Sequence, residues 1–391
     1  MNTANDNYKE NDQILAFATF FPFFSLMIQS LLYNLLGETL LIHIMILIVS
    51  TIPMLFAVKI WIKYHLVYAS TVYFVTILIL LLSYFIFPEN RVGYWSRLSV
   101  DFLLMCLPCF INISIIKDNK NILDVLSKIS FFIWAFGISI FIIKISGKSI
   151  LNENYSMSFS SYMLLPSLFY IYQFIVSKKI LYMLISFSSF LAVVLIGSRG
   201  AAVSWGLYLI IGIIYSNHNK LVHLSSVVIG LTIYFYGTTI VEFFYRFIKK
   251  IGIESRTIEL IRLGKVLTYQ SGRQQLQRPI LNAINEHPII GNGISSEYTL
   301  IGTYSHNIFL DIILNGGILF GGIFILIIFI QCIRKFILED DKLFFWLLFC
   351  YGFIPMIISG SYLSSIPFWI FLGYVSNNRK MKIVFSKMAS I

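Results

Sequence analysis

The chain has 391 residues, of which 58% are hydrophobic and 12% are charged. Lysine and arginine number 29 against 18 aspartates and glutamates, which gives a net charge of +11. This composition excludes a soluble globular protein and indicates a polytopic membrane protein, in which excess cations mark cytoplasmic loops. No basic cluster is interleaved with aromatic residues in a polar segment, so we expect no nucleic-acid partner.

The N-terminal region starts a series of apolar runs. Residues 1–13 are polar, and the run 14–36 is too long for a signal-peptide core, so we expect a retained first span. The predicted spans are 14–36, 39–58, 65–87, 98–116, 129–146, 159–176, 180–196, 201–215, 221–240, 308–332, 343–359 and 361–376. The expected fold is therefore all-α, with about 12 transmembrane helices. The runs 201–215 and 361–376 are short enough to be tilted or partly re-entrant.

The spans divide the chain into three parts. We expect helices 1–9 in residues 1–240, a long loop with short helices in 241–304, and helices 10–12 with a tail in 305–391. When both termini are placed in the cytoplasm, most cations outside the long loop fall on the cytoplasmic side, as the positive-inside rule requires. The long loop and Arg199 then lie on the external side.

Two helices are predicted in the long loop. Residues 242–263 alternate aromatic and aliphatic residues with basic ones, which is typical of a helix in the headgroup layer. A second helix is expected over 272–286, with Ser271 as its cap and Pro288 forcing its end. Its apolar face would consist of Leu276, Ile280, Ala283 and Ile284.

Two arginines are candidate phosphate ligands. Arg273 lies in the first turn of the predicted helix, where free N–H groups favour an anion, although it could equally be a solvated loop cation. Arg199 lies between Gly197 and Gly200 at the end of a span, where a simple topological flank is the alternative. The two glycines would let a lipid head group approach the backbone closely. Arg278 is expected to be an auxiliary cation for head groups or phosphate.

His306 is the candidate general base. Imidazole titrates near neutrality and can accept a proton from a sugar hydroxyl, although a lone interfacial histidine is more often structural. Asn307 would orient the ring or bind a sugar hydroxyl. Asp311, an acid inside an apolar span, is a candidate substrate-binding group by default, with the orientation of neighbouring polar groups as its alternative role.

Signatures of other enzyme classes are missing from the sequence. It has no Walker loop, no Gly-x-Ser-x-Gly elbow and no His/carboxylate cluster, so we expect neither a metal nor a cofactor. Cys106 and Cys109 have a metal-ligand spacing but no second pair, which favours buried thiols.

The short motifs occur in a recognisable order. They are Gly197-Ser198-Arg199-Gly200, Ser271-Gly272-Arg273, Gly291-Asn292-Gly293, His306-Asn307 and Asn315-Gly316-Gly317. This series, over roughly residues 196–322, resembles the O-antigen ligase/polymerase superfamily of polytopic glycosyltransferases.

The resemblance implies a GT-C-like fold and an inverting, metal-independent glycosyltransferase in the bacterial inner membrane. The donor and the acceptor would both be glycans on undecaprenyl pyrophosphate, and 241–304 would be the periplasmic catalytic loop. Arg199 and Arg273 would bind the donor pyrophosphate, and His306 would deprotonate the acceptor. Membrane lipids and a chain-length regulator protein would be the other partners.

Three functions fit these features to different degrees. We favour an O-antigen polymerase of lipopolysaccharide biosynthesis, while an O-antigen ligase that transfers the glycan to lipid A core shares the same motifs. A polysaccharide flippase or transporter is the alternative of another class, but it would spread charges through the middle of several spans.

Overall fold

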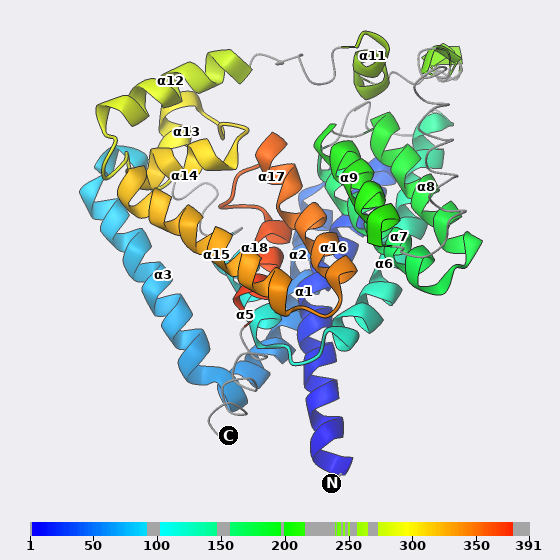
Figure 1. Ribbon diagram of the computed structural model, residues 1–391, viewed down its shortest axis with the longest axis horizontal. Helices are drawn as coiled ribbons and strands as arrows, with labels where there is room; N and C mark the ends of the chain where they lie inside the picture. The colour runs from blue at the N-terminus through cyan, green and yellow to red at the C-terminus, as the bar shows by residue number, and fades with distance from the viewer. Residues whose placement is uncertain are drawn as a thin grey trace. The chain divides into compact units, whose positions relative to one another are not determined.

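The computed structural model describes residues 2–91, 102–146, 157–196, 199–215, 239, 241–243, 245–246, 249–250, 256–264 and 273–377. These residues form helices and connecting turns, with no strand among them (Figure 1). The chain divides into two compact units. Unit 1 consists of Met1–Thr19, Ile52–Val125 and Ser271–Ile391, and unit 2 of Phe20–Thr51 and Leu126–Gln270.

The described elements follow one another along the whole chain. They are α1 (Asn2–Leu36), α2 (Leu40–Ile60), the π-helical η1 (Trp61–His65), α3 (Leu66–Ile86), the 3-10 turn η2 (Pro88–Asn90), α5 (Leu107–Ile115), α6 (Asn119–Ile145), α7 (Met157–Ser177), α8 (Ile180–Ile196), α9 (Arg199–Tyr215), α11 (Arg256–Arg262), α12 (Arg273–Glu286), α13 (Ser296–Ile301), α14 (Ile308–Gly316), the π-helical η4 (Gly317–Gly321), α15 (Gly322–Leu338), α16 (Lys342–Gly352), α17 (Ile354–Ile358) and α18 (Ile366–Ser376).

Five helical stretches of the described residues are long and apolar enough to cross a membrane, which confirms a helical membrane protein. They are Tyr8–Leu36, Leu40–Ile86, Asn119–Ile143, Ser158–Ser177 and Ile308–Leu338. The other predicted spans correspond to shorter apolar helices, except that 221–240, apart from residue 239, lies outside the described residues. The predicted span 361–376 is helical only from Ile366, over 11 residues. The total of about 12 crossings and the GT-C-like arrangement remain predictions.

The stretch Leu40–Ile86 covers two predicted spans without the loop that was expected between them. Its 47 residues would form a straight helix of about 70 Å, more than twice the hydrocarbon thickness. The chain instead stays helical through η1 and leaves helical geometry at His65, where φ is −140° and ψ is 24°. Lys59 and Lys63 lie at this bend, so the bend takes the place of the expected loop at a membrane surface.

Unit 2 is held together by aromatic rings and by serines at helix crossings. The ring of Phe24 in α1 lies 5.6 Å from the ring of Phe132 in α6. Ser186 of α8 donates to the Ser167 carbonyl of α7 at 2.7 Å and accepts from the Trp205 indole of α9 at 3.2 Å. Small polar side chains let membrane helices approach closely and bond to one another, so α7, α8 and α9 pack as one group.

In unit 1, α18 packs against α5 and α16. Gly373 of α18 lies so close to α5 that an added Cβ would be 2.5 Å from the Phe110 carbonyl oxygen. The rings of Phe345 and Phe349 in α16 lie 6.2 and 5.5 Å from the ring of Phe371 in α18. This packing anchors the turn 359–365 that joins α17 to α18.

The C-terminal end of α3 is bonded to the loop that precedes α13. Ser83 of α3 accepts from the Ile294 amide at 2.9 Å, and Asn90 of η2 donates to the Asn292 carbonyl at 2.7 Å. The tip of α3 therefore lies beside the group formed by α12, α13 and α14 in unit 1 (Figure 1).

The N-terminal end of α3 lies near a different polar region. Tyr64 and His65, just before α3, line a small pocket together with Asp12 and Lys117. A helix of 21 residues is about 32 Å long, close to the thickness of the hydrocarbon core. The loop 292–294 and the Asp12 region are thus attached to opposite ends of a helix of membrane length.

Candidate active site

The loop 288–293 and the end of α14 are joined directly through their backbones. Four hydrogen bonds of 2.8–3.1 Å join them: from Asn292 to Leu314, from Gly293 to Asn315, from Ile318 to Pro288 and from Leu319 to Ile289. The carbonyls at the end of a helix lack partners within the helix, and here the loop supplies them. The two glycine-containing motifs recognised in the sequence are therefore each other's partners.

Glycine is required at two positions of this junction. Gly291 and Gly317 have φ values of 81° and 61°, in the left-handed region that side chains rarely adopt. An added Cβ would be 2.4 Å from Gly317 N in the first case and 2.3 Å from the Ile289 carbonyl oxygen in the second. Both conformation and close approach therefore exclude a side chain.

His306 lies in the segment just before α14. Its backbone is left-handed, with a φ of 63°, which is uncommon for a residue other than glycine. Its Nδ1 lies 2.8 Å from Ser359 Oγ in the turn 359–365, and its ring centroid lies 4.5 Å from that of Tyr304. As a whole, the residue is half-buried.

Asn307 is the N-cap of α14. Its Oδ1 accepts from the amides of Phe309 and Leu310 at 3.0 and 3.4 Å. The Ser305 hydroxyl accepts from the Asn307 amide at 3.1 Å and donates to the Asn307 carbonyl at 2.8 Å. Because Oδ1 is used in capping, the predicted contact of Asn307 with a sugar hydroxyl would have to use the side-chain NH₂ group.

Two acidic side chains are buried behind His306. Asp311 of α14 and Glu297 of α13 are each 0% exposed. Asp311 Oδ1 accepts from the Ser305 amide at 3.0 Å. Among the described residues, Asp311 Oδ2 and both carboxyl oxygens of Glu297 lack a hydrogen-bond partner. Burial and the neighbouring Asp311 raise the pKa of Glu297 from 4.5 to about 8.

The helix α12 confirms the second helix predicted for the long loop. It begins at Arg273 and ends at Glu286, before Pro288, and its apolar face packs on α14 through Ile280 and Ala283. Gln277 Nε2 donates to the Ser305 carbonyl at 3.5 Å, so this side of α12 meets the segment that carries His306.

The two loop arginines both belong to α12. Arg273 is the first residue of this helix. Arg278 is exposed. Ser271, the predicted cap, lies outside the described residues. Of the predicted helix 242–263, the described residues are 242–243, 245–246, 249–250 and 256–263, and α11 (Arg256–Arg262) is the longest helix among them.

Arg199 belongs to unit 2, where it is the first residue of α9 and half-buried. Gly200 is buried, and its carbonyl accepts from the Ser204 hydroxyl at 2.9 Å. Gly197 lies outside the described residues. The position of Arg199 at the start of a helix agrees with the predicted span boundary.

Three residues near His306 were not selected from the sequence: Ser359, Glu297 and Gln277. The run Ser359-Gly360-Ser361 interrupts two apolar segments, which was a usable signal for a polar turn at the membrane surface. Glu297 and Gln277 gave no such signal. Glu297 is unusual only because it is buried beside Asp311, which is distant in sequence, and Gln277 bonds to a backbone carbonyl.

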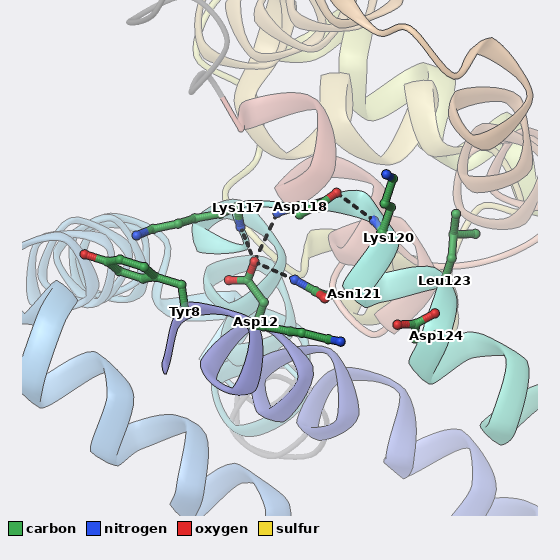
Figure 2. A pocket seen from close by; sticks show the side chains of 9 residues that line it. Tyr8, Asp12, Lys117, Asp118, Lys120, Asn121, Leu123 and Asp124 are labelled. Carbon is green, nitrogen blue, oxygen red and sulfur yellow. Dashed lines mark hydrogen bonds between the residues drawn. The ribbon is translucent and has the colours of Figure 1, made fainter. Parts of the chain in front are cut away.

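A pocket with a volume of about 650 Å³ is at the other end of unit 1, near Asp12 (Figure 2). Asp12 Oδ2 accepts from the amides of Lys117 and Asp118 and from the Asn121 side chain at 2.9–3.2 Å. Three lysines and three aspartates line the pocket, so it has no excess charge to attract a phosphate. Asp12 has a structural role there, because it ties the turn before α6 to α1.

No group of three or more His, Cys, Asp or Glu side chains suited to a metal occurs in the described part of the chain. Cys106, Cys109 and Cys350 are buried and, like Cys332, are free thiols.

Residues 184–327 match the family described as O-antigen ligase. The matched segment runs from within α8 through α12 and α14 into α15, and so contains Arg199, Arg273 and His306. It confirms the resemblance drawn from the sequence motifs and supports the O-antigen ligase/polymerase superfamily. No curated protein and no solved structure matches the chain.

Proposed function

We propose, from its place in the O-antigen ligase/polymerase superfamily, that this membrane protein is a glycosyltransferase that joins lipid-linked oligosaccharide repeat units into O-antigen polysaccharide. The observation that carries this proposal is the setting of His306 within the matched family segment. Its Nδ1 is engaged by Ser359, the residue as a whole is half-buried, and its backbone is held in a left-handed turn.

This setting suits a general base. When Nδ1 donates to Ser359 Oγ, Nε2 carries the lone pair and accepts the proton of an acceptor hydroxyl. The deprotonated hydroxyl oxygen attacks the anomeric carbon of the donor, and the bond from that carbon to the pyrophosphate oxygen breaks. Attack opposite the leaving group inverts the anomeric centre, and the polyprenyl pyrophosphate departs with the electron pair.

The leaving group gains negative charge, which cations can stabilise without a metal. Arg273 is the proposed cation in unit 1, because it is the first residue of α12, at the end where free backbone N–H groups favour an anion, and because it lies in the matched family segment. Arg199 in unit 2 is proposed from its motif and its place in the matched family segment. Arg278, which is exposed, is assigned to head groups.

The external position of the site is supported by unit 1 itself. The loop 292–294 and the region of Asp12 are attached to opposite ends of α3, whose 21 residues span about 32 Å. Lys9, Lys117 and Lys120 line the pocket at the Asp12 end. Cytoplasmic loops collect lysine, so we assign the Asp12 end to the cytoplasm and the His306 end to the periplasm.

The ligase function is the second candidate, because the matching family is described as O-antigen ligase. Inactivating the chromosomal gene in its host and analysing the surface lipopolysaccharide on a gel separates the two. A polymerase mutant would retain a single repeat unit on lipid A core, because a separate ligase is still present. A ligase mutant would carry no repeat unit, and polymer would accumulate on the polyprenyl carrier. Normal long chains would contradict both functions.

A further inference from the structure

The buried carboxyl groups of Glu297 and Asp311 present an electrostatic problem. Both side chains are 0% exposed, and no lysine or arginine forms an ion pair with either among the described residues. Each of two adjacent negative charges in such a site would lose its hydration, which costs free energy. Their mutual repulsion would raise that free-energy cost further. At least one of the two groups must therefore hold a proton.

The hydrogen bonds show which member is ionised. Asp311 Oδ1 accepts from the Ser305 amide at 3.0 Å, and such a bond favours a carboxylate. The oxygens of Glu297 lack a hydrogen bond of ordinary geometry among the described residues, and its burial outweighs the weaker stabilisation of a charge by its own backbone and by the Asn315 side chain. The proton therefore belongs to Glu297, and the charge to Asp311.

Asp311 is the member of the acid pair that is bonded to the segment that carries His306. The Ser305 amide that Asp311 binds is one peptide unit before the left-handed His306. Beside the pair, Ser296 donates to Asn315 Oδ1 at 2.9 Å, which links α13 to α14. A left-handed backbone at a histidine needs support from its surroundings, and Asp311 supplies part of it.

We propose that Glu297 and Asp311 are positioning residues: Glu297 holds one buried proton, and Asp311, as the carboxylate, holds His306 in its left-handed turn through the Ser305 amide. The assignment of a catalytic purpose to this device rests on the proposed role of His306 as the base. The pair would act from behind the loop, without contact with the sugar or the pyrophosphate.

The charged groups on the surrounding elements do not compete for this proton. Among the described charged side chains, Asp311 of α14 is the one whose charge acts on the Glu297 carboxyl. Glu89 of η2, the adjacent Arg91, and Arg278 and Glu286 of α12 are all exposed to solvent. His306 is engaged by Ser359 on the other side of the segment.

The proton on Glu297 makes folding depend on pH in an unusual direction. Its pKa of about 8 in the folded protein is above the ordinary 4.5, so the folded state binds more protons than the unfolded state between these values. Stability is therefore greatest near and below pH 4.5 for this group, and it decreases as the pH rises towards 8. Glutamine resembles protonated glutamate and should remove this dependence.

The first test measures thermal unfolding of the detergent-solubilised full-length protein from pH 6 to 9. We expect the Tm of the wild type to fall with pH more steeply than that of Glu297→Gln, with Glu297→Gln the more stable of the two at pH 9. The matched control is Glu89→Gln, an exposed glutamate in η2, which should follow the wild type. Equal slopes for the wild type and Glu297→Gln would overturn the assignment of a buried proton to Glu297. Stabilisation of the wild type, but not of Glu297→Gln, by Mg²⁺ or Ca²⁺ would also overturn it, because the acids would then form a cation site.

The second test measures the position of His306 without using glycosyl transfer. Diethyl pyrocarbonate modifies accessible imidazoles, and the rate at His306 can be divided by that at the exposed His287 of the same molecule. We expect this ratio to rise at least threefold in Asp311→Ala and to be unchanged in Glu297→Gln. An unchanged ratio in Asp311→Ala would overturn the positioning role. If wild-type protein transfers no glycan, the proposed function is wrong. The pH dependence of Tm and the modification rate of His306 would still test the positioning role of Glu297 and Asp311.

Discussion

His306 Nδ1 lies 2.8 Å from Ser359 Oγ, although 53 positions separate the two residues in the sequence. This bond can fix the ring tautomer and leave Nε2 for the acceptor. Removing the hydroxyl with Ser359→Ala should slow transfer by about 2- to 10-fold, the worth of one ordinary hydrogen bond. Ser364→Ala, in the same turn and also half-buried, is the control and should keep wild-type activity. Equal activities of the two variants in a purified transfer assay would contradict the role of Ser359.

The glycine junction makes a prediction about stability. Gly317 and Gly302 both have left-handed backbones, with φ values of 61° and 70°, but only Gly317 would place a Cβ against backbone atoms. Alanine at Gly302 should cost about 1–2 kcal/mol from conformation alone. Alanine at Gly317 should cost more, because the contact with the Ile289 carbonyl has to open. Thermal unfolding of the two variants measures the difference. Equal losses would mean that the loop 288–293 is not held against α14 as described.

The arginines are predicted to act through their planar geometry and not through charge alone. Arg199→Lys and Arg273→Lys keep the charge but cannot form a bidentate contact with phosphate, so each should lose most transfer activity. Arg278→Lys is the control within α12, and it should stay near the wild type because its side chain is exposed. Wild-type activity of both lysine variants at a normal protein level would reduce Arg199 and Arg273 to topological flanks.

The assigned orientation can be tested at the two ends of unit 1. Glu89 in η2 and Lys120 in α6 are exposed and lie near the His306 end and the Asp12 end of that unit. In intact spheroplasts an impermeant maleimide should label Glu89→Cys but not Lys120→Cys. Three of the four native cysteines are buried, which keeps the background low. Labelling of Lys120→Cys alone would place the candidate site in the cytoplasm and reject a periplasmic reaction.

The sequence was sufficient to predict most of the described helices, because periodicity and short polar runs are local signals. The helix over 272–286 was predicted from its cap, its apolar face and Pro288, and the burial of Ile280 and Ala283 confirms that face. The bend at His65 was not predicted from the sequence, since a π-helical turn has no distinct composition. Lys59 and Lys63 indicated a loop at this place.

The polar contacts around His306 were beyond sequence reasoning for a different reason. The bonds to Ser359 and from Ser305 to Asp311 depend on how α14, α17 and α18 pack, and no pattern along the chain reports it. Glu297 reads as an ordinary loop acid in the sequence, and only its complete burial beside Asp311 makes it unusual.

The central claim is that His306 removes a proton during transfer, and His306→Asn tests it most directly. Asparagine tolerates the left-handed backbone and can still bond to Ser359, but it does not titrate near neutrality. Transfer and donor binding are measured side by side on purified protein in nanodiscs, with a polyprenyl pyrophosphate-linked oligosaccharide. Transfer should fall by about 10²–10⁴-fold, while donor affinity and Tm stay at wild-type values. Transfer by His306→Asn at the wild-type rate would contradict the account, because the imidazole could then not be the base.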